Sequence, residues 1–273
     1  MPSVSIYSIY LNNISPEVVN YQKQVIDLLL PEKWEFEQVL HQPKAGEGFF
    51  HATALEECIK KNKSDIIVFL DIDCIPLNQK ALTSLVDKAA QGFLTGAVQR
   101  ANHLQNAAHL YVGPFCMAFS FAQYKKLGCP SLKESDRGDC GEELTYMWEE
   151  KGPGIQLLWP THVYRPAWAL RESISFGYGT TYEKSFYHAF AIRQAFMQGQ
   201  FVNKCKEVIA ATPKKVTPAE PKVEPKKITP KEVKEPIESK KEIQASKESK
   251  TREDKKQVSA VKEVSTIQER LIK

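Results

Sequence analysis

Two aspartates one residue apart, Asp71 and Asp73, are the residues whose types and spacing most clearly indicate chemistry. They end a near-continuous apolar run that starts at residue 65, which is typical of a central parallel strand. Ligands of open α/β sheets bind at the carboxyl ends of strands, and two carboxylates held there repel each other unless a cation is present. The pair therefore predicts a Mg²⁺ or Mn²⁺ site for phosphate chemistry. The plainer alternative is a cap on the strand and on the turn before Pro76.

A second acidic cluster consists of Asp139, Glu142 and Glu143. It lies at the start of a predicted helix over residues 141–150, where the helix dipole favours negative charge. This position is compatible with a catalytic carboxylate and equally with ordinary electrostatics at a helix start.

A late histidine is a third candidate. The segment 164–187 is rich in Gly, Ser, Tyr and Thr and is predicted to be a long loop, which in a compact domain is often functional. His188 follows it, and a neutral imidazole there could complete a Mn²⁺ site begun by carboxylates. His162 is the competing histidine.

The elements that must position these residues follow from the hydrophobic pattern of the first 210 residues. Apolar runs of strand length alternate with segments of helical period, which predicts an α/β domain of the Rossmann-like kind, with a mostly parallel central sheet flanked by helices. Ser15 followed by Pro16 marks the start of the first helix. The predicted strands are 4–11, 34–40, 65–71, 93–99, 113–121 and 155–159, and the predicted helices are 16–30, 48–61, 78–91 and 141–150.

Over about the first 200 residues the sequence resembles the nucleotide-sugar glycosyltransferases of the A-type (GT-A) fold. The resemblance rests on three features in order: an opening strand ending in Leu11-Asn12-Asn13, the segment His51-Ala-Thr-Ala-Leu55, and the Asp71-Ile72-Asp73 motif after its apolar strand. It implies a single GT-A-like domain over residues 1–210.

The resemblance also implies an activity: a sugar moves from a nucleotide diphosphate sugar to a hydroxyl of a glycan or other acceptor, with inversion and with Mn²⁺ or Mg²⁺ as cofactor. Asp71 and Asp73 are the implied metal ligands, with His188 as a third. The residues implied at the nucleotide-sugar site are Leu11, Asn12, Asp71, Ile72, Arg100, Asn102 and Gly113.

The implied general base is a carboxylate of the acidic cluster. In similar inverting enzymes a Glu/Asp-Asp element deprotonates the acceptor hydroxyl, whereas this sequence has Glu142-Glu143 in its place. That departure leaves open which carboxylate acts. The second position favours Glu143, followed by Glu142 and Asp139.

Charge is distributed unevenly along the chain. The 273 residues carry a formal net charge of +4, but residues 211–273 hold 17 basic and 11 acidic residues, which leaves 20 basic and 22 acidic residues for 1–210. The slightly acidic domain argues against nucleic acid as a partner. Because 211–273 has no aromatic residue, we expect a disordered Lys/Glu/Pro-rich tail, basic enough for weak contact with a membrane surface.

Other functional classes are excluded or disfavoured. No apolar stretch is long enough for a transmembrane segment and no signal peptide is evident, so we expect a cytoplasmic location. Six scattered cysteines without a C-x-x-C pair argue against a zinc ribbon. A metal-dependent nucleotidyltransferase is disfavoured because no Gly-rich basic loop follows the first strand. A non-catalytic scaffold of the same fold, with a partner-binding tail, stays open.

Overall fold

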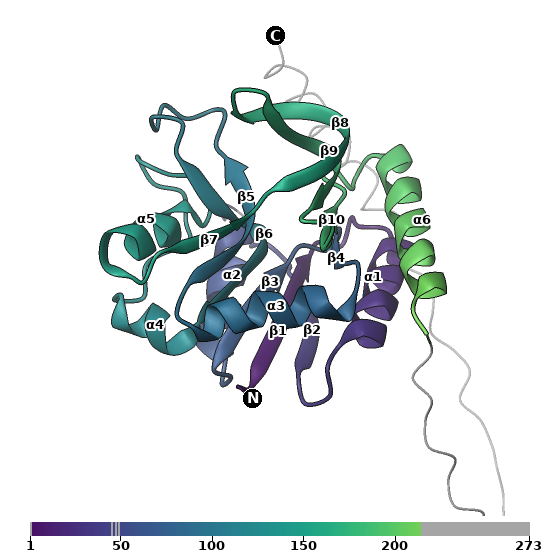
Figure 1. The fold of residues 1–273 in the computed structure, drawn as a ribbon, viewed down its shortest axis with the longest axis horizontal. Coiled ribbons are helices and arrows are strands. Elements are labelled where there is room, and N and C mark those ends of the chain that lie inside the picture. Colours follow the sequence, from purple (N-terminus) through teal and green to yellow (C-terminus); the bar gives the residue numbers. More distant parts are fainter. Residues whose placement is uncertain (1, 45, 47, 49, 214–273) are drawn as a thin grey trace, which may run out of the picture. The chain divides into compact units, whose positions relative to one another are not determined.

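The computed structural model of the chain describes residues 2–44, 46, 48 and 50–213 (Figure 1). The strands are β1 (Val4–Tyr10), β2 (Glu35–Leu40), β3 (Ile66–Leu70), β4 (Cys74–Pro76), β5 (Leu94–Arg100), β6 (Leu110–Ser120), β7 (Ile155–Leu158), β8 (Pro160–Arg171), β9 (Ile174–Tyr182) and β10 (Phe186–His188). The helices are α1 (Pro16–Leu29), α2 (Phe50–Lys61), α3 (Gln79–Ala90), α4 (Phe121–Lys126), α5 (Glu142–Lys151) and α6 (Ala195–Ala211). Every strand and helix predicted from the sequence is present, with its ends within three residues of the prediction.

A six-stranded sheet lies at the centre, in the order β2-β1-β3-β6-β5-β7. Its strands are parallel except β6, which runs antiparallel to β3 and β5. All five residues of β3 are buried, as their apolar character predicted. The predicted α/β fold, with a mostly parallel central sheet flanked by helices, is confirmed.

Helices cover both faces of this sheet (Figure 1), so each face has its own apolar core. Neighbouring residues of β3 point to opposite faces, and Val68 and Phe69 accordingly belong to different cores. The first core packs against α1, α3 and α6, and the second packs against α2, α4 and α5. The helices thereby fix the strand ends from which the candidate residues project.

A second, antiparallel sheet has the order β4-β10-β9-β8. The prediction of a long loop over 164–187 is therefore wrong. The Tyr, Thr and Phe residues of the segment favour strands, and its glycines serve close packing. A Cβ at Gly177 would lie only 2.4 Å from the carbonyl oxygen of Arg165 on the paired strand β8. The glycine at position 177, a residue type that suggested a turn, is thus required by the pairing of β9 with β8.

The pairing of β10 with β4 joins two distant parts of the chain. β4 begins at Cys74, immediately after Asp73, and His188 lies opposite Cys74 in the register. His188 therefore reaches the carboxyl end of β3, although it comes 115 positions after Asp73 in the sequence.

Helix α6 was not predicted, and it ends one residue beyond the predicted domain boundary at residue 210. The predicted disordered tail, 211–273, lies outside the described residues except for 211–213. Among the helices of the described part of the chain, none is both long and apolar enough to cross a membrane.

Candidate functional site

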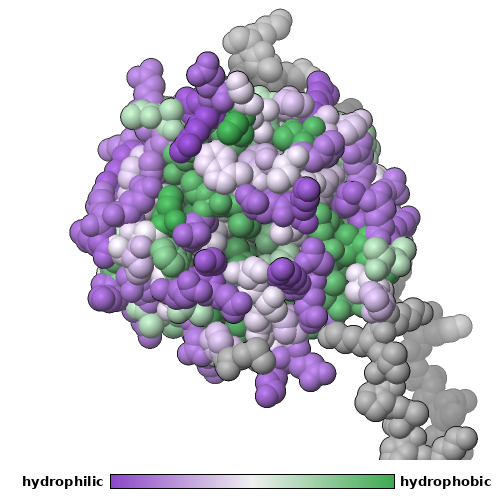
Figure 2. Space-filling view, viewed as in Figure 1, coloured by the Kyte–Doolittle hydropathy of each residue, from purple (hydrophilic) through white to green (hydrophobic). Residues whose placement is uncertain are grey.

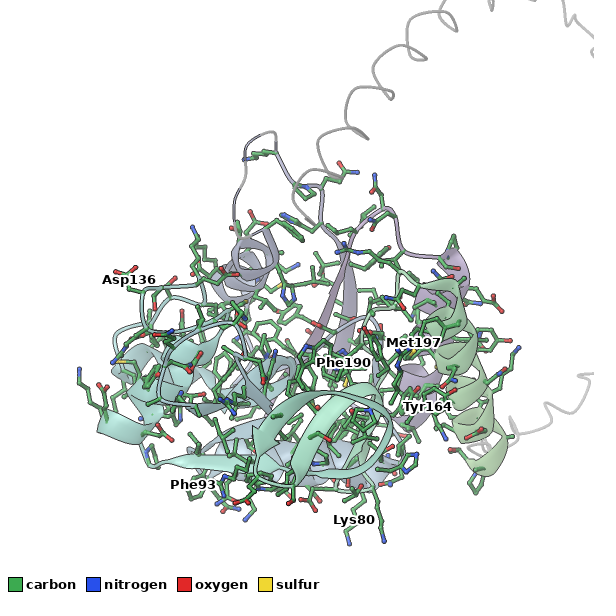
Figure 3. The ribbon with its side chains drawn as sticks, turned by 90° about the horizontal axis from the view of Figure 1, so that it is seen from above. Lys80, Phe93, Asp136, Tyr164, Phe190 and Met197 are labelled. Carbon is green, nitrogen blue, oxygen red and sulfur yellow. The ribbon has the colours of Figure 1, made fainter. Side chains whose placement is uncertain are left out.

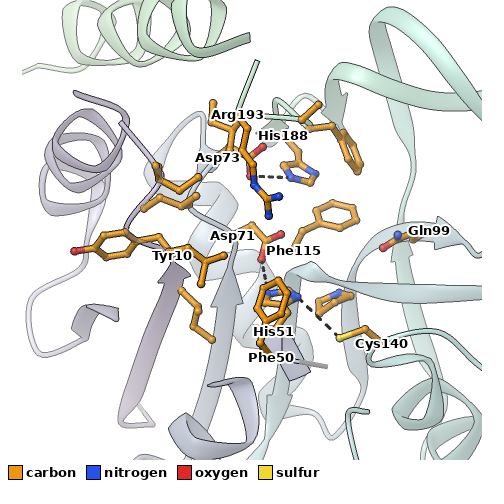
Figure 4. Close-up of a pocket in the computed structure, with 18 of the residues that line it drawn as sticks. Tyr10, Phe50, His51, Asp71, Asp73, Gln99, Phe115, Cys140, His188 and Arg193 are labelled. Atoms are coloured by element: carbon orange, nitrogen blue, oxygen red, sulfur yellow. Dashed lines mark hydrogen bonds and ion pairs between the residues drawn. The ribbon is translucent and has the colours of Figure 1, made fainter. Parts of the chain in front are cut away.

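A cavity of about 640 Å³ opens where β1 and β3 reach their carboxyl ends, the edge at which α/β sheets bind ligands (Figure 4). Its lining comes from the end of β1, the start of α2, the turn after β3, the strand β6, the segment before α5 and the segment after β10. Segments far apart in the sequence, from Ile9 to Gln194, therefore contribute to one site.

Asp71, Asp73 and His188 meet in this cavity. One ligand atom from each lies within 4.8 Å of the others, and His188 Nε2 is 3.1 Å from Asp73 Oδ1. The side chains of His188 and Asp73 are only 4% and 7% exposed. Two carboxylates and an imidazole form a donor set that suits a divalent ion such as Mn²⁺. The structure thus brings together the three residues predicted as metal ligands.

Backbone hydrogen bonds fix the turn that carries both aspartates. The Cys74 N–H donates to the Asp71 carbonyl at 2.8 Å and closes the turn. On its two sides, the Asp71 N–H donates to the Phe115 carbonyl at 2.9 Å and the Ala189 N–H donates to the Asp73 carbonyl at 3.0 Å. The two carboxylates are therefore held in place by β6 and by the segment after β10.

The His188 ring packs against two aromatic rings that also contact each other. Its centroid is 4.2 Å from that of Phe115, which stacks on it, and 3.8 Å from that of Phe190. These contacts keep Nε2 directed at the carboxylates, while the buried Nδ1 has no hydrogen-bond partner among the residues described. An imidazole held in this way and facing two carboxylates fits a divalent metal.

The segment after His188 has a strained backbone. Phe190 and Ala191 have φ values of 56° and 45°, in the left-handed region that non-glycine residues rarely adopt. Phe190 packs beside the β8–β9 hairpin, against Trp168 and Phe176 (Figure 3). This packing holds the strained turn, and the chain then continues along the cavity wall through Arg193.

His51 of α2 forms an ion pair with Asp71, with Nε2 3.2 Å from Oδ1. Burial alone would raise the pKa of Asp71, but the charge of His51 and its hydrogen bond outweigh burial and lower it. Conversely, burial would lower the pKa of His51, but Asp71 holds it well above its usual range. The Nδ1 atom of His51 lies 4.0 Å from Cys140 Sγ. His51 thereby links α2 to the aspartate turn and to the segment before α5.

The structure separates the three residues of the acidic cluster. Asp139 lines the cavity, and its carboxylate accepts hydrogen bonds from the Tyr111 hydroxyl at 3.1 Å and from the Cys140 N–H at 2.7 Å. Glu142 is fully buried behind it, and Glu143 forms a two-pronged ion pair with Arg137 at the surface. Neither glutamate is among the residues that line the cavity.

The predicted nucleotide-sugar residues are also divided. Leu11 and Ile72 line the cavity together with Asp71, whereas the exposed Asn12 does not. Gly113 lies in β6 under Gln99 and Phe115, and a Cβ there would be 2.3 Å from the Phe115 ring.

Arg100 and Asn102 lie away from the cavity. Arg100 lines a second hollow of about 750 Å³ between β5, β7 and β8, in the region where Figure 2 shows hydrophobic side chains over β5 and β7. Asn102 donates to the carbonyls of Arg100 and Ala169, at 3.0 and 3.2 Å. His162, the competing histidine, is exposed on β8 and does not line the cavity.

Several cavity residues received no role from the sequence. They are Tyr10, Phe50, His51, Gln99, Tyr111, Phe115, Cys140, Phe190 and Arg193. Some of them carried a signal, because they are close to residues that the resemblance pointed to: Tyr10 to Leu11, Gln99 to Arg100, and Tyr111 and Phe115 to Gly113, while His51 begins one of its motifs. Arg193 follows a segment whose path was mispredicted, so no sequence pattern placed it near Asp71.

Neither a family model nor a curated protein matches the sequence. Solved structures with similar arrangements include the mannosyltransferase PcManGT from Pyrobaculum calidifontis in complex with GDP-Man and Mn²⁺, at 15% identity and a TM-score of 0.43, covering 57% of this chain and 54% of that one. The bifunctional IspDF from Campylobacter jejuni has 10% identity and a TM-score of 0.35, with coverage of 57% and 49%. A glycosyltransferase involved in glycosylation of the major capsid of PBCV-1 has 14% identity and a TM-score of 0.38, with coverage of 57% and 81%. The chain thus spans about half the length of the first two, and at these TM-scores none of the three identifies its family.

Proposed function

We propose that the chain is a metal-dependent glycosyltransferase that moves a sugar from a nucleotide diphosphate sugar to an acceptor hydroxyl. The observation that supports this most strongly is the convergence of Asp71, Asp73 and His188 at the carboxyl edge of the sheet, inside a cavity of about 640 Å³. That volume is in the range of ordinary small-molecule sites.

The donor would lie along the cavity with its diphosphate beside these three residues. A Mn²⁺ or Mg²⁺ ion held by them would supply Lewis-acid stabilisation of the departing diphosphate. Arg193 is the one arginine or lysine among the described residues that line the cavity, and Figure 4 shows its guanidinium directed toward Asp71. It would offset part of the diphosphate charge. The apolar end formed by Tyr10 and Leu11 would receive the base.

Asp139 is the carboxylate placed to accept the acceptor's proton, because of the three acidic candidates it alone lines the cavity. In the proposed step the acceptor oxygen bonds to the anomeric carbon while the bond from that carbon to the diphosphate oxygen breaks. The hydroxyl proton passes to Asp139, and attack opposite the leaving group inverts the anomeric centre. Glu143, the residue favoured by the sequence, would instead keep its ion pair with Arg137 at the surface.

Thermal stability with nucleotides tests the donor site. The full chain is mixed with UDP, GDP, CDP or ADP, each with and without Mn²⁺, as wild type, as Asp73→Asn and as the surface control Asp27→Asn. We expect Mn²⁺-dependent stabilisation by one nucleotide, of about 2.7 kcal/mol at a ligand concentration 100 times Kd. It should persist in Asp27→Asn and vanish in Asp73→Asn. Stabilisation that survives in Asp73→Asn would contradict the assignment of the site.

Product analysis separates this function from its rivals. Incubation with UDP- and GDP-sugars, including GDP-mannose, should release a nucleoside diphosphate if the chain is a glycosyltransferase. A nucleotidyltransferase would instead react the nucleotide sugar with labelled pyrophosphate and release a sugar 1-phosphate and a labelled nucleoside triphosphate. If no nucleotide binds in any combination, the scaffold alternative is favoured and the proposed activity is refuted.

A further inference from the structure

Gln22 of α1 is a fully buried polar residue whose side chain uses its whole hydrogen-bonding capacity. Its Nε2 donates to the carbonyl oxygens of Asp71 at 2.6 Å and Cys74 at 3.1 Å. Its Oε1 accepts from Ser8 Oγ and Gln38 Nε2, each at 2.9 Å. Backbone carbonyls only accept, so the amide nitrogen must face the turn and the orientation of the carboxamide is unambiguous.

The two carbonyls that Gln22 binds are the first and last of the turn that carries the metal-binding carboxylates. The turn has a single closing bond of its own, from the Cys74 N–H to the Asp71 carbonyl. Its remaining backbone bonds go to Phe115 and Ala189, on the other side of the site. Gln22 thus supplies the contact from α1 and spans the turn from end to end.

Ser8 and Gln38 fix Gln22 in turn. Ser8 belongs to β1 and is fully buried, and Gln38 belongs to β2 and also donates to the Val19 carbonyl at 2.8 Å. The Gln22 carboxamide is therefore held by two strands of the sheet and cannot rotate away without breaking buried hydrogen bonds. Groups that orient metal ligands in this way affect metal affinity although they do not touch the ion.

We propose that Gln22 is a positioning residue that sets the spacing of the Asp71 and Asp73 carboxylates for divalent-metal binding. This inference rests on the proposed metal site. Removal of the carboxamide leaves the Cys74 carbonyl without the Gln22 donor and the Asp71 carbonyl with the Cys74 N–H alone. The turn then relaxes and the carboxylates lose the geometry that a metal requires. Metal affinity should fall by about 10- to 100-fold, the range for loss of a partner that orients metal ligands.

The test is a titration of the full chain with Mn²⁺ alone, in which electron paramagnetic resonance measures the concentration of free Mn²⁺ at each step. Gln22→Met keeps the side-chain length and removes both donors, and Gln22→Asn keeps a carboxamide that is one methylene too short. The matched control is Asn62→Leu, which removes another buried carboxamide, hydrogen-bonded to Ser64 at the amino end of β3. Circular dichroism establishes that each variant is folded.

We expect both Gln22 variants to bind Mn²⁺ about 10- to 100-fold more weakly than wild type, while Asn62→Leu binds with wild-type affinity despite a lower Tm. Folded Gln22→Met with unchanged affinity would overturn the inference and leave the metal site intact. Equal losses in Gln22→Met and Asn62→Leu would also overturn it, since general loosening of the core would then explain both. If wild type does not bind Mn²⁺, or if Asp73→Asn binds Mn²⁺ as tightly as wild type, the proposed metal site is refuted and this inference is refuted with it. If Gln22→Met does not fold, Gln22→Asn decides between these outcomes.

Discussion

Replacement of Glu142 by alanine should destabilise the protein strongly, although Glu142 begins a helix and lies outside the cavity. Its carboxylate is fully buried and accepts three hydrogen bonds, from Asn106 Nδ2 at 2.6 Å, His109 Nδ1 at 2.7 Å and the Asp139 N–H at 2.8 Å. The substitution leaves three donors without this acceptor. Removing one partner from a buried charged cluster costs about 3–5 kcal/mol, and we expect a loss in that range.

Glu143→Ala is the matched control, because the residue is next to Glu142 in the first turn of α5 and interacts similarly with the helix dipole. Its partner Arg137 is 46% exposed, and ion pairs of this kind contribute about 0–1 kcal/mol. The free energy of unfolding of both variants and wild type is measured by urea denaturation. From the structure we expect the loss of unfolding free energy in Glu142→Ala to exceed that in Glu143→Ala by at least about 2 kcal/mol.

The loss of unfolding free energy in Glu142→Ala should also depend on pH. Burial lowers the pKa of His109, but hydrogen bonds and charges from Glu142 and Glu149 outweigh it and raise the pKa above 6.5. Protonated His109 therefore stabilises the fold fully below the unfolded-state pKa, and this contribution is lost as pH rises through the folded-state pKa. The loss should be larger at pH 6 than at pH 9. A loss below about 1 kcal/mol, or one that is equal at both pH values, would refute this account of Glu142.

Three further predictions concern the site and its support. Asp139→Asn should lower kcat by about 10²- to 10⁴-fold with nucleotide affinity unchanged, whereas Glu143→Gln should retain turnover. The rate at which nucleoside diphosphate is released measures both effects. The reverse result would restore Glu143 as the base. Arg193→Ala should weaken Mn²⁺-dependent binding of a nucleoside diphosphate by about 10- to 100-fold and leave nucleoside binding unchanged, as measured by calorimetry; equal effects on both ligands would place Arg193 away from the diphosphate. Gly177→Ala should lower the free energy of unfolding, measured by urea denaturation, by about 1–3 kcal/mol, because the added Cβ would meet the Arg165 carbonyl. Gly199→Ala, which has open space around it in α6, should raise the free energy of unfolding by up to about 1 kcal/mol. Similar values for the two variants would contradict the close strand contact.

The sequence predicted the part of the site that depends on local pattern. Asp71 and Asp73 follow a run of apolar residues that forms a buried strand wherever it folds, so their position at a strand end required no knowledge of the rest of the chain. The segment 164–187 failed for the opposite reason. Its glycines indicate a loop when composition alone is considered, but Gly177 is required by the paired backbone of β8, a contact that no local pattern records.

The choice between Glu142 and Glu143 was also beyond a local pattern. Adjacent residues of a helix point about 100° apart, so one of them can face the interior while the other faces solvent. Which one does so depends on Asn106 and His109, which reach Glu142 from the segment before β6. Resemblance favoured the second position, whereas in the structure neither glutamate lines the cavity and Asp139 does.

The two histidines beside the aspartate pair show how the fold distinguishes residues that have the same chemistry. The sequence argument assigned the neutralisation of two adjacent carboxylates to a metal, but His51 already supplies a cation beside Asp71, 3.2 Å away. His51 contacts one carboxylate and turns its other nitrogen toward Cys140, so it is suited to orient Asp71. His188 has a ligand atom within 4.8 Å of both carboxylates and packs against Phe115 and Phe190. The geometry therefore supports His188 as the third ligand and His51 as the residue that orients Asp71. This division of roles follows from the β10–β4 pairing and not from the local sequence of either histidine.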